Sequence, residues 1–173
     1  MFSIIICTYN RAEYIYKTLQ CIAGNDFPVG EYEVLLINNN STDNTEQECS
    51  RFSKDYPTSI DYQYFVETKQ GLSHARNRGI EESKYDMLIF LDDDSFVKND
   101  YLFNLKGQLR DYNDAIAFGG KIAPIFESGV EPKWISKWSY SWVSALDKGS
   151  EVVLFKGKSY PVGANMGFSI KVA

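Results

Sequence analysis

The chain has 173 residues, of which 44% are hydrophobic and 24% charged, a composition typical of a folded globular domain and not of a disordered segment. The length predicts a single domain over residues 1–173. Eighteen basic against 23 acidic residues give a net charge of -5, which argues against a nucleic-acid partner because phosphate neutralisation needs an excess of Lys and Arg.

The cysteines and the apolar stretches of the chain indicate in which cellular compartment the protein is expected. Cys7, Cys21 and Cys49 form an odd, scattered set, which predicts reduced thiols in a cytoplasmic protein. No stretch approaches the roughly 20 apolar residues of a membrane helix, and no basic region precedes an apolar run as in a signal peptide. We therefore expect no transmembrane segment, with peripheral contact at the inner face of the membrane left open.

Strand-like and helix-like segments alternate along the first two thirds of the chain. Apolar, β-branched runs predict strands at residues 2–7, 32–37, 60–66, 87–91 and 115–118. Helices are expected between them, with N-terminal caps at Asn10, Asp43 and Ser73, and a last amphipathic helix from Leu102 to Tyr112. This alternation predicts an α/β fold in which helices flank a mostly parallel sheet.

The last third gives weaker signals. Trp134, Trp138 and Trp142 recur every four residues, which predicts an aromatic stripe on one helix. Burial in the core is favoured over a sugar-binding platform, because large aromatic side chains mainly bury area. Residues 152–155 and 159–162 predict short strands, the second confined to a sheet edge by Pro161.

Polar clusters follow the predicted strands, namely Thr8-Tyr9-Asn10, Asn38-Asn39-Asn40, the segment after Val66 and Asp92-Asp93-Asp94. Ligands of open α/β sheets bind outside the carboxyl ends of the strands, so these clusters predict one binding site. A tyrosine can contact a flat base, and an Asn amide complements the N3–H and carbonyls of uracil. Ordinary turn chemistry is the alternative for both Asn-containing clusters.

Two charged groups could bind a nucleotide diphosphate. Three consecutive aspartates repel one another unless a cation offsets their charge, and carboxylates suit Mg²⁺ or Mn²⁺; a solvated acidic turn is the alternative. Arg76 could neutralise a diphosphate, although pairing with Glu81 or Glu82 would explain an arginine here as well. His74, the single histidine, has no identifiable partner and is expected to pack or hydrogen-bond more readily than to act as a base.

Taken in order, six segments resemble the family 2 glycosyltransferases of the GT-A fold: SIIICTYNR, VLLINNNSTD, GLSHARNRGI, MLIFLDDDS, AFGGKIAP and PVGANMGFSI. The resemblance implies that Thr8, Tyr9, Asn10, Asn38 and Asn39 hold the nucleoside, usually uridine, and that Arg76 supports the donor site. It also implies nucleotide and metal contacts for the aspartates, with Asp94 as principal metal ligand beside Asp92, while Asp93 serves the nucleotide. The donor-sugar and acceptor region would comprise Gly120, Gly163, Ala164, Asn165 and Met166.

The function implied is metal-dependent, inverting transfer of a sugar from a UDP-linked donor to a carbohydrate or lipid-linked acceptor, with surface-polysaccharide synthesis as the expected setting. The chain departs from the family at Asn38 and Asn39, where an Asp is common, and the family's catalytic base is expected beyond residue 173. Alternatives are a non-catalytic nucleotide-sugar-binding module, an interaction domain with an acidic patch, or a sugar-phosphate nucleotidyltransferase. The last is disfavoured because Cys7–Asn10 lacks a glycine-rich phosphate loop.

Overall fold

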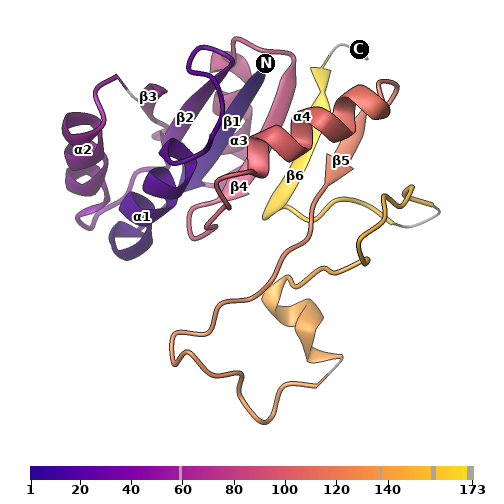
Figure 1. Ribbon diagram of the computed structural model, residues 1–173. Coiled ribbons are helices and arrows are strands. Elements are labelled where there is room, and N and C mark those ends of the chain that lie inside the picture. Colours follow the sequence, from indigo (N-terminus) through magenta and orange to yellow (C-terminus); the bar gives the residue numbers. More distant parts are fainter. Residues whose placement is uncertain (59, 137, 157–158, 171–173) are drawn as a thin grey trace.

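The computed structural model describes residues 1–58, 60–136, 138–156 and 159–170. Its centre is a six-stranded sheet of order β3-β2-β1-β4-β6-β5, in which β1 to β4 run parallel and β6 runs antiparallel to both neighbours (Figure 1). The strands are β1 Phe2–Thr8, β2 Tyr32–Asn38, β3 Asp61–Val66, β4 Met87–Asp92, β5 Ala117–Gly119 and β6 Asn165–Ser169. The helices are α1 Ala12–Ala23, α2 Thr45–Asp55, α3 Leu72–Glu82, α4 Tyr101–Asp111 and the 3₁₀ helix η1 Ser139–Val143.

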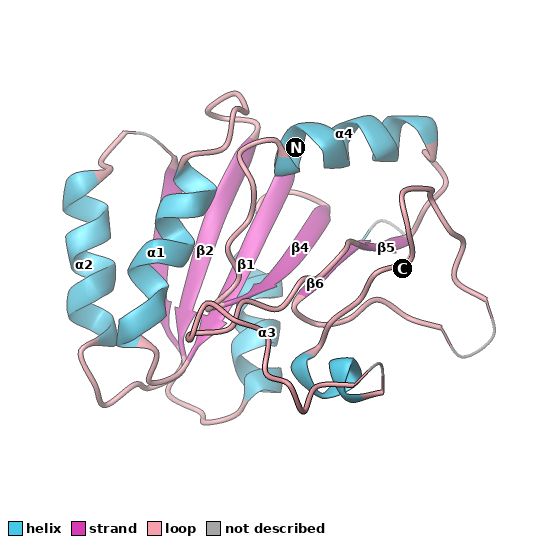
Figure 2. Cartoon of the chain, turned by 60° about the horizontal axis from the view of Figure 1, so that its bottom comes forward, coloured by secondary structure: helices cyan, strands magenta, loops and turns pink. Residues whose placement is uncertain are grey.

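Helices cover both faces of the sheet (Figure 2). Successive strand side chains point to opposite faces. Ile4 and Ile6 therefore belong to the larger core, which α1, α2 and α4 complete with residues such as Phe52 and Leu102. Ile5 belongs to the smaller core under α3. Since both faces are buried, β1 and β2 need the continuous apolar runs that identified them in the sequence.

A glycine sets the distance between α3 and the sheet. A Cβ atom on Gly79 would lie 2.4 Å from Cγ2 of Ile5, so only glycine allows this approach of the helix to β1. Arg76 lies three residues earlier in α3 and thus near the same helix face. The close packing of Gly79 therefore fixes where Arg76 is presented.

The strand order places a topological switch point between β1 and β4. From β1 the chain passes to β2 and β3 on one side and then crosses to β4 on the other side of β1. In open α/β sheets, ligands bind outside the strand ends at such a switch point. The fold by itself therefore directs attention to the residues that follow β1 and β4.

The predicted α/β class and the first four strands are confirmed, while the three predicted helix caps are wrong; the N-cap of α2 is Asn44, the residue after Asp43. Asn10 has a φ of 53° and precedes the N-cap, Arg11; its Oδ1 instead accepts from the Thr42 amide at 2.7 Å. Asp43 supplies the acceptor for the start of α1, because its Oδ2 accepts from the Ala12 amide at 3.1 Å. Ser73 lies inside α3, which has Gly71 at its N-cap.

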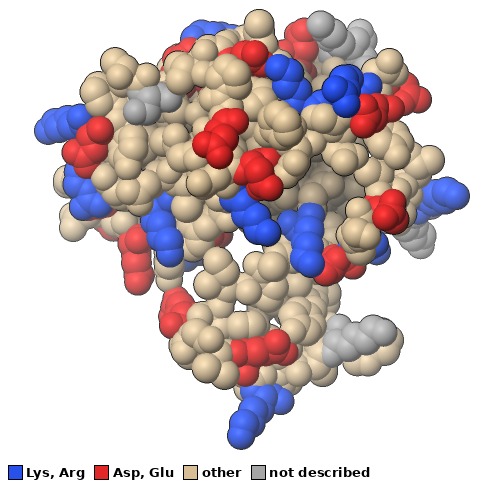
Figure 3. Space-filling view, viewed as in Figure 1, with Lys and Arg blue, Asp and Glu red and all other residues tan. Residues whose placement is uncertain are grey.

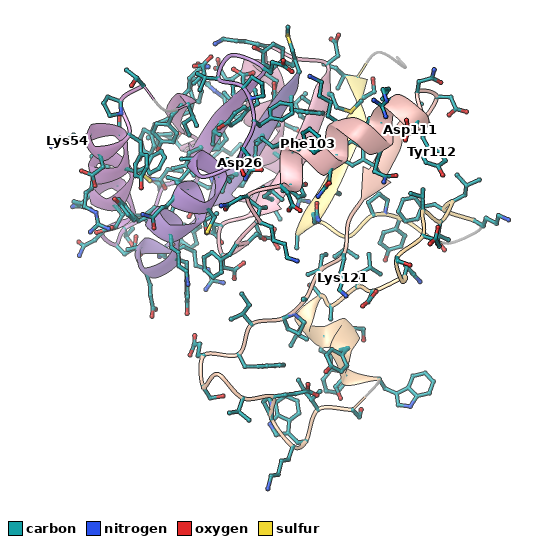
Figure 4. All side chains as sticks on the ribbon, in the orientation of Figure 1. Asp26, Lys54, Phe103, Asp111, Tyr112 and Lys121 are labelled. Carbon is teal, nitrogen blue, oxygen red and sulfur yellow. The ribbon has the colours of Figure 1, made fainter. Side chains whose placement is uncertain are left out.

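Between β5 and β6, the described residues from 121 to 162 project away from the sheet (Figure 1). Lys121 lies where this segment leaves the sheet (Figure 4), and its Nζ is 2.6 Å from Oδ2 of Asp147. Ile122 and Leu146 form an antiparallel bridge that closes the base of the projection. Tyr14 of α1 donates to Glu127 at 2.6 Å, so the projection also contacts the helix layer.

The predictions for this projecting segment are wrong. Trp134, Trp138 and Trp142 are 70%, 85% and 83% exposed, and only the last lies in a helix, the short η1. The four-residue spacing failed as a signal because a helix is stabilised mainly by burying its apolar face, and these three side chains stay exposed. Residues 152–155 and the described residues 159–162 are irregular, so the two strands predicted there are wrong.

The described helices include none that is both long and apolar enough to cross a membrane. All three cysteines are free, as predicted. Lys and Arg side chains are interspersed with Asp and Glu over the face shown in Figure 3.

Candidate functional site

The predicted polar clusters meet at one edge of the sheet. Thr8 pairs with Asn38 across β1 and β2, and Cys7 pairs with Asp92 across β1 and β4. On the other side of β4, Leu91 pairs with Asn165 at the start of β6. The strand register therefore brings the segments predicted to hold the nucleoside, the diphosphate and the sugar into one continuous row.

The three aspartates differ in exposure. Asp92 and Asp93 are half-buried and Asp94 is exposed. The turn that carries them is held from α1, where the buried Thr18 hydroxyl donates to the Asp93 carbonyl at 2.8 Å. Arg11 lies beside the turn, with Nε 3.8 Å from Oδ1 of Asp93. Asp92 and Asp93 are therefore not part of a fully solvated acidic turn, which was the alternative to a metal site.

The carboxylates of this turn carry a burial cost that the nearby arginines offset only in part. Burial raises the pKa of Asp93 to about 6, against the opposing effects of the nearby Thr8 hydroxyl and of Arg11. The Thr8 hydroxyl makes no hydrogen bond of standard geometry. Burial also raises the pKa of Asp92, and the neighbouring Asp94 adds to this effect, while Arg76 and Arg11 oppose it. A cation at this turn would relieve the repulsion.

Replacing Asp93 by asparagine is expected to stabilise the protein at neutral pH. An aspartate in the unfolded chain has a pKa of about 3.9, so the raised folded-state pKa means that the contribution of Asp93 to stability falls as pH rises from about 4 through 6. Its side chain is only 13% exposed. Urea unfolding of Asp93→Asn should therefore show a gain of about 2 kcal/mol at pH 7.5 and almost none at pH 4.

The control variant for the change in stability is Asp111→Asn, because Asp111 is exposed. A loss of stability for Asp93→Asn at pH 7.5 would instead mean that the ion pair with Arg11 outweighs the cost of burial.

The donor set fits a metal that is shared with a ligand. Within the described residues, no group of three or more His, Cys, Asp or Glu side chains could hold a metal ion. Mg²⁺ usually takes one or two carboxylates plus substrate phosphates and retains waters. Asp92 and Asp94, which lie in one turn, would supply the one or two carboxylate ligands that such a site takes from the protein.

Arg76 reaches the same edge from α3. Its guanidinium carbon lies 5.6 Å from the centre of the Phe90 ring, and its charge acts on Asp92 and on the buried thiol of Cys7. A Cβ atom on Gly163 would lie 2.9 Å from Nη2, so the guanidinium packs directly against this glycine. Arg76 forms no salt bridge with a described residue.

The neighbouring Arg78 is paired with a glutamate of its own helix. Its Nη2 lies 2.7 Å from Oε1 of Glu82, one helical turn away. His74 makes no side-chain hydrogen bond or salt bridge within the described chain, so nothing here supports it as a base. Arg76, unlike Arg78, is therefore placed to meet a ligand anion at the strand ends.

Asn38 and Asn39 are 4% exposed, and their amides bond within the chain. Asn38 donates to the Tyr64 hydroxyl at 2.7 Å and accepts from the Ser41 amide at 2.9 Å. Asn39 uses both amide hydrogens on the carbonyls of Glu67 and Lys69 and accepts from the Gly71 amide at 2.7 Å. Asn39 therefore holds the loop between β3 and α3 that leads to Arg76, whereas Asn38 holds the loop after β2.

The exposed part of the predicted base site is formed by the segment after β1. Tyr9 is 49% exposed and Asn10 is exposed, whereas Thr8 is buried. The backbone of Asn10 is tied to the loop after β2, because its amide donates to Ser41 Oγ at 3.0 Å. The Tyr9 ring is thus available beside a rigid turn.

The predicted sugar region lies on a strand that the sequence did not reveal. Gly163 and Ala164 form the turn before β6, and Asn165 and Met166 begin the strand. The Ala164 carbonyl accepts from Ser95 Oγ at 3.3 Å, and Gly120 donates to the Asn165 carbonyl at 3.3 Å. The aspartate turn, the end of β5 and the start of β6 are therefore linked directly.

Two residues near the site were missed. Arg11 directly follows the first motif, so the chain order TYNR could have indicated it. Tyr101 begins α4 and donates to Asn165 at 2.8 Å, a contact across 64 positions for which the sequence carries no signal.

The mostly parallel sheet, with a switch point, a carboxylate turn and an arginine at its strand ends, defines an α/β domain whose ligand site is expected at this edge. Residues 3–173 match the model of Glycosyl transferase family 2, and the chain belongs to that family, as predicted. Its relatives include glycosyltransferase AglE of Haloferax volcanii, 40% identical over 93 residues, 53% of this chain and 30% of AglE. Poly(ribitol-phosphate) beta-N-acetylglucosaminyltransferase TarS of Staphylococcus aureus is 29% identical over 102 residues, 58% of this chain and 17% of TarS.

Solved structures agree in fold. The mannosyltransferase PcManGT from Pyrobaculum calidifontis, in complex with GDP-Man and Mn²⁺, has a TM-score of 0.63 at 27% identity over 67% of this chain and 34% of that one. S. aureus TarS 1-349 in complex with UDP has a TM-score of 0.64 at 25% identity over 76% of this chain and 38% of that one. The chain therefore has the fold of GT-A glycosyltransferases and spans less than two fifths of each of these relatives.

Proposed function

We propose that this chain binds a nucleotide-diphosphate sugar, UDP-linked in the first instance, and acts in metal-dependent, inverting transfer of its sugar to a carbohydrate or lipid-linked acceptor hydroxyl. One observation supports this proposal most directly. Three aspartates lie at the switch point of the sheet together with an arginine that forms no salt bridge to a described residue, namely the half-buried Asp92 and Asp93, the exposed Asp94 and Arg76. Family membership supports the reaction class, and relatives named for polysaccharide and teichoic acid synthesis support the setting.

The nucleoside is assigned to the ends of β1 and β2. Tyr9 offers an exposed ring for the base next to Thr8 and Asn10. Both amide hydrogens of Asn39 are donated within the chain, and its Oδ1 accepts from the Gly71 amide. Oδ1 has a second lone pair, which could accept from the N3–H of uracil. Asn38 is given the supporting task of holding the loop after β2.

The diphosphate is assigned to the carboxyl end of β4. When bound, Mg²⁺ or Mn²⁺ would neutralise the charge that develops on the leaving diphosphate. Asp94 and Asp92 would hold the cation, and Asp93 would face the nucleotide. Arg76 would offer charge-assisted hydrogen bonds to the same phosphates, which stabilises the leaving group where charge develops.

The sugar is assigned to Gly120 and to Gly163, Ala164, Asn165 and Met166 at the start of β6. Cytoplasmic placement is supported by the three free thiols. Contact with the inner face of the membrane is supported by the exposed tryptophans of the projecting segment, since such rings favour the interface between lipid and water.

The test is calorimetric titration of UDP and GDP into the chain with Mn²⁺ or with EDTA. We expect UDP to bind in Mn²⁺ and not in EDTA. Arg76→Ala should weaken UDP binding about 10- to 100-fold, as expected for losing a charge-assisted hydrogen bond of about 1.5–3 kcal/mol. Arg78→Ala, on the same helix but paired with Glu82, is the matched control and should leave binding unchanged. Absence of binding to either nucleotide would contradict the proposed function.

A further inference from the structure

Tyr101 holds one side chain of the predicted sugar region from a helix outside that region. It is the first residue of α4, and its hydroxyl donates to Oδ1 of Asn165 at 2.8 Å. Burial raises the pKa of Tyr101 well above its ordinary value, so the phenol stays protonated and remains a donor at physiological pH. The bond therefore ties the amide oxygen of Asn165 to α4.

Gly120 confines the other side of the same amide. A Cβ atom at Gly120 would lie only 2.4 Å from Nδ2 of Asn165, so a glycine is needed for the amide to occupy this place. The Gly120 amide donates to the Asn165 carbonyl at 3.3 Å, which fixes the backbone as well. Asn165 is thus held between α4 and the end of β5, with its oxygen and nitrogen in set positions.

The nitrogen of this amide remains available. Nδ2 of Asn165 makes no hydrogen bond to the described residues, whereas Oδ1 is engaged by Tyr101. Asn165 pairs with Leu91, the residue before Asp92, and Ala164 contacts Ser95 just after the aspartates. A free donor is therefore held next to the turn that is proposed to bind the diphosphate.

Building on the proposed function, we propose that Tyr101 is a positioning residue: by binding Oδ1 it fixes the Asn165 amide so that Nδ2 faces the ligand as a donor to an oxygen of the transferred sugar. Without the phenol hydroxyl the amide can rotate and present either its oxygen or its nitrogen, because the two ends have nearly the same shape. Tyr101 would then influence binding of the sugar without touching it.

The experiment compares nucleotide and nucleotide sugar on wild type, Tyr101→Phe, Asn165→Ala and the double variant, by calorimetry in Mn²⁺. The probes are UDP, UDP-GlcNAc, UDP-glucose and GDP-mannose. We expect Tyr101→Phe to weaken the best-bound nucleotide sugar about 3- to 10-fold, as for one net hydrogen bond, and to change UDP binding less than about 2-fold. The double variant should be no weaker than Asn165→Ala alone, because the two residues act through one contact.

Tyr112→Phe is the matched control, since Tyr112 follows the same helix and is 41% exposed. Equal weakening of UDP and nucleotide sugar by Tyr101→Phe, or additive effects in the double variant, would overturn the role of Tyr101. Should Tyr101→Phe fail to fold, Asn165→Asp keeps the acceptor for Tyr101 but removes the donor, and unchanged sugar binding in that variant would equally overturn it. A wild type that binds no nucleotide would instead refute the proposed function itself.

Discussion

Replacing Asp94 by asparagine is expected to weaken Mn²⁺-dependent binding of UDP by at least about 100-fold, since even indirect supports of a metal site cost 10- to 100-fold in metal affinity. The variant keeps the size of the side chain and removes the charge that a divalent cation needs. Asp94 is exposed, so the fold should tolerate the change. The measurement is calorimetric titration of Mn²⁺ with UDP present at saturation, with unfolding curves recorded in parallel.

Asp111→Asn serves as the control, because Asp111 is an exposed aspartate at the end of α4 and lies apart from the strand ends. Comparable metal dependence in Asp94→Asn and wild type would assign the cation elsewhere, and the same titration on Asp92→Asn would then identify its ligand.

Replacing Gly167 by alanine is expected to cost about 3 kcal/mol of stability, at the upper end of the usual cost of overpacking a core. A Cβ atom there would lie 2.0 Å from Cζ of Phe118 and 2.6 Å from the carbonyl oxygen of Leu88. The ring can move, but the carbonyl belongs to β4, so β6 must shift away from its neighbour. Thermal unfolding should show a fall of about 6–12 °C for a chain of this length.

Gly107→Ala is the matched control, because we expect it to raise stability where Gly167→Ala lowers it. Nothing lies within 4 Å of a Cβ atom at Gly107, which is inside α4, so alanine should stabilise the helix by about 0.5–1 kcal/mol. If Gly167→Ala proved as stable as Gly107→Ala, the close packing of β6 against β4 and β5 would be contradicted.

The first half of the fold was predictable because burial and periodicity agree there. Strands β1, β2 and β4 are buried on both faces and have largely apolar runs, and Ile15, Leu19 and Ile22 mark the buried face of α1. The helix caps were harder to predict from the sequence. The Ala12 amide at the start of α1 donates to Asp43 in a neighbouring loop and not to Asn10. Such a long-range cap has no local signature.

The second half escaped prediction for a different reason. The sequence of β6, Asn-Met-Gly-Phe-Ser, has neither an apolar run nor strict alternation, and its one buried residue is Gly167. Its strand character comes from pairing with β4 and β5, which is tertiary information. The site residues were found from chain order at the strand ends, but Arg11 and Tyr101 depend on side-chain contacts that only the folded chain defines.

The position of β6 in the chain bears on how the site is assembled during folding. Strands β1 to β4 are complete by Asp92, whereas β6 can pair with β4 only after residues 93–164 have been placed. Closing a long segment costs conformational entropy before any contact rewards it, so this pairing is expected to form late. Pulsed hydrogen exchange would show β6 amides protected after those of β1. The nucleotide side of the site would then exist before the sugar side, and a nucleotide that binds it would stabilise the partly folded chain.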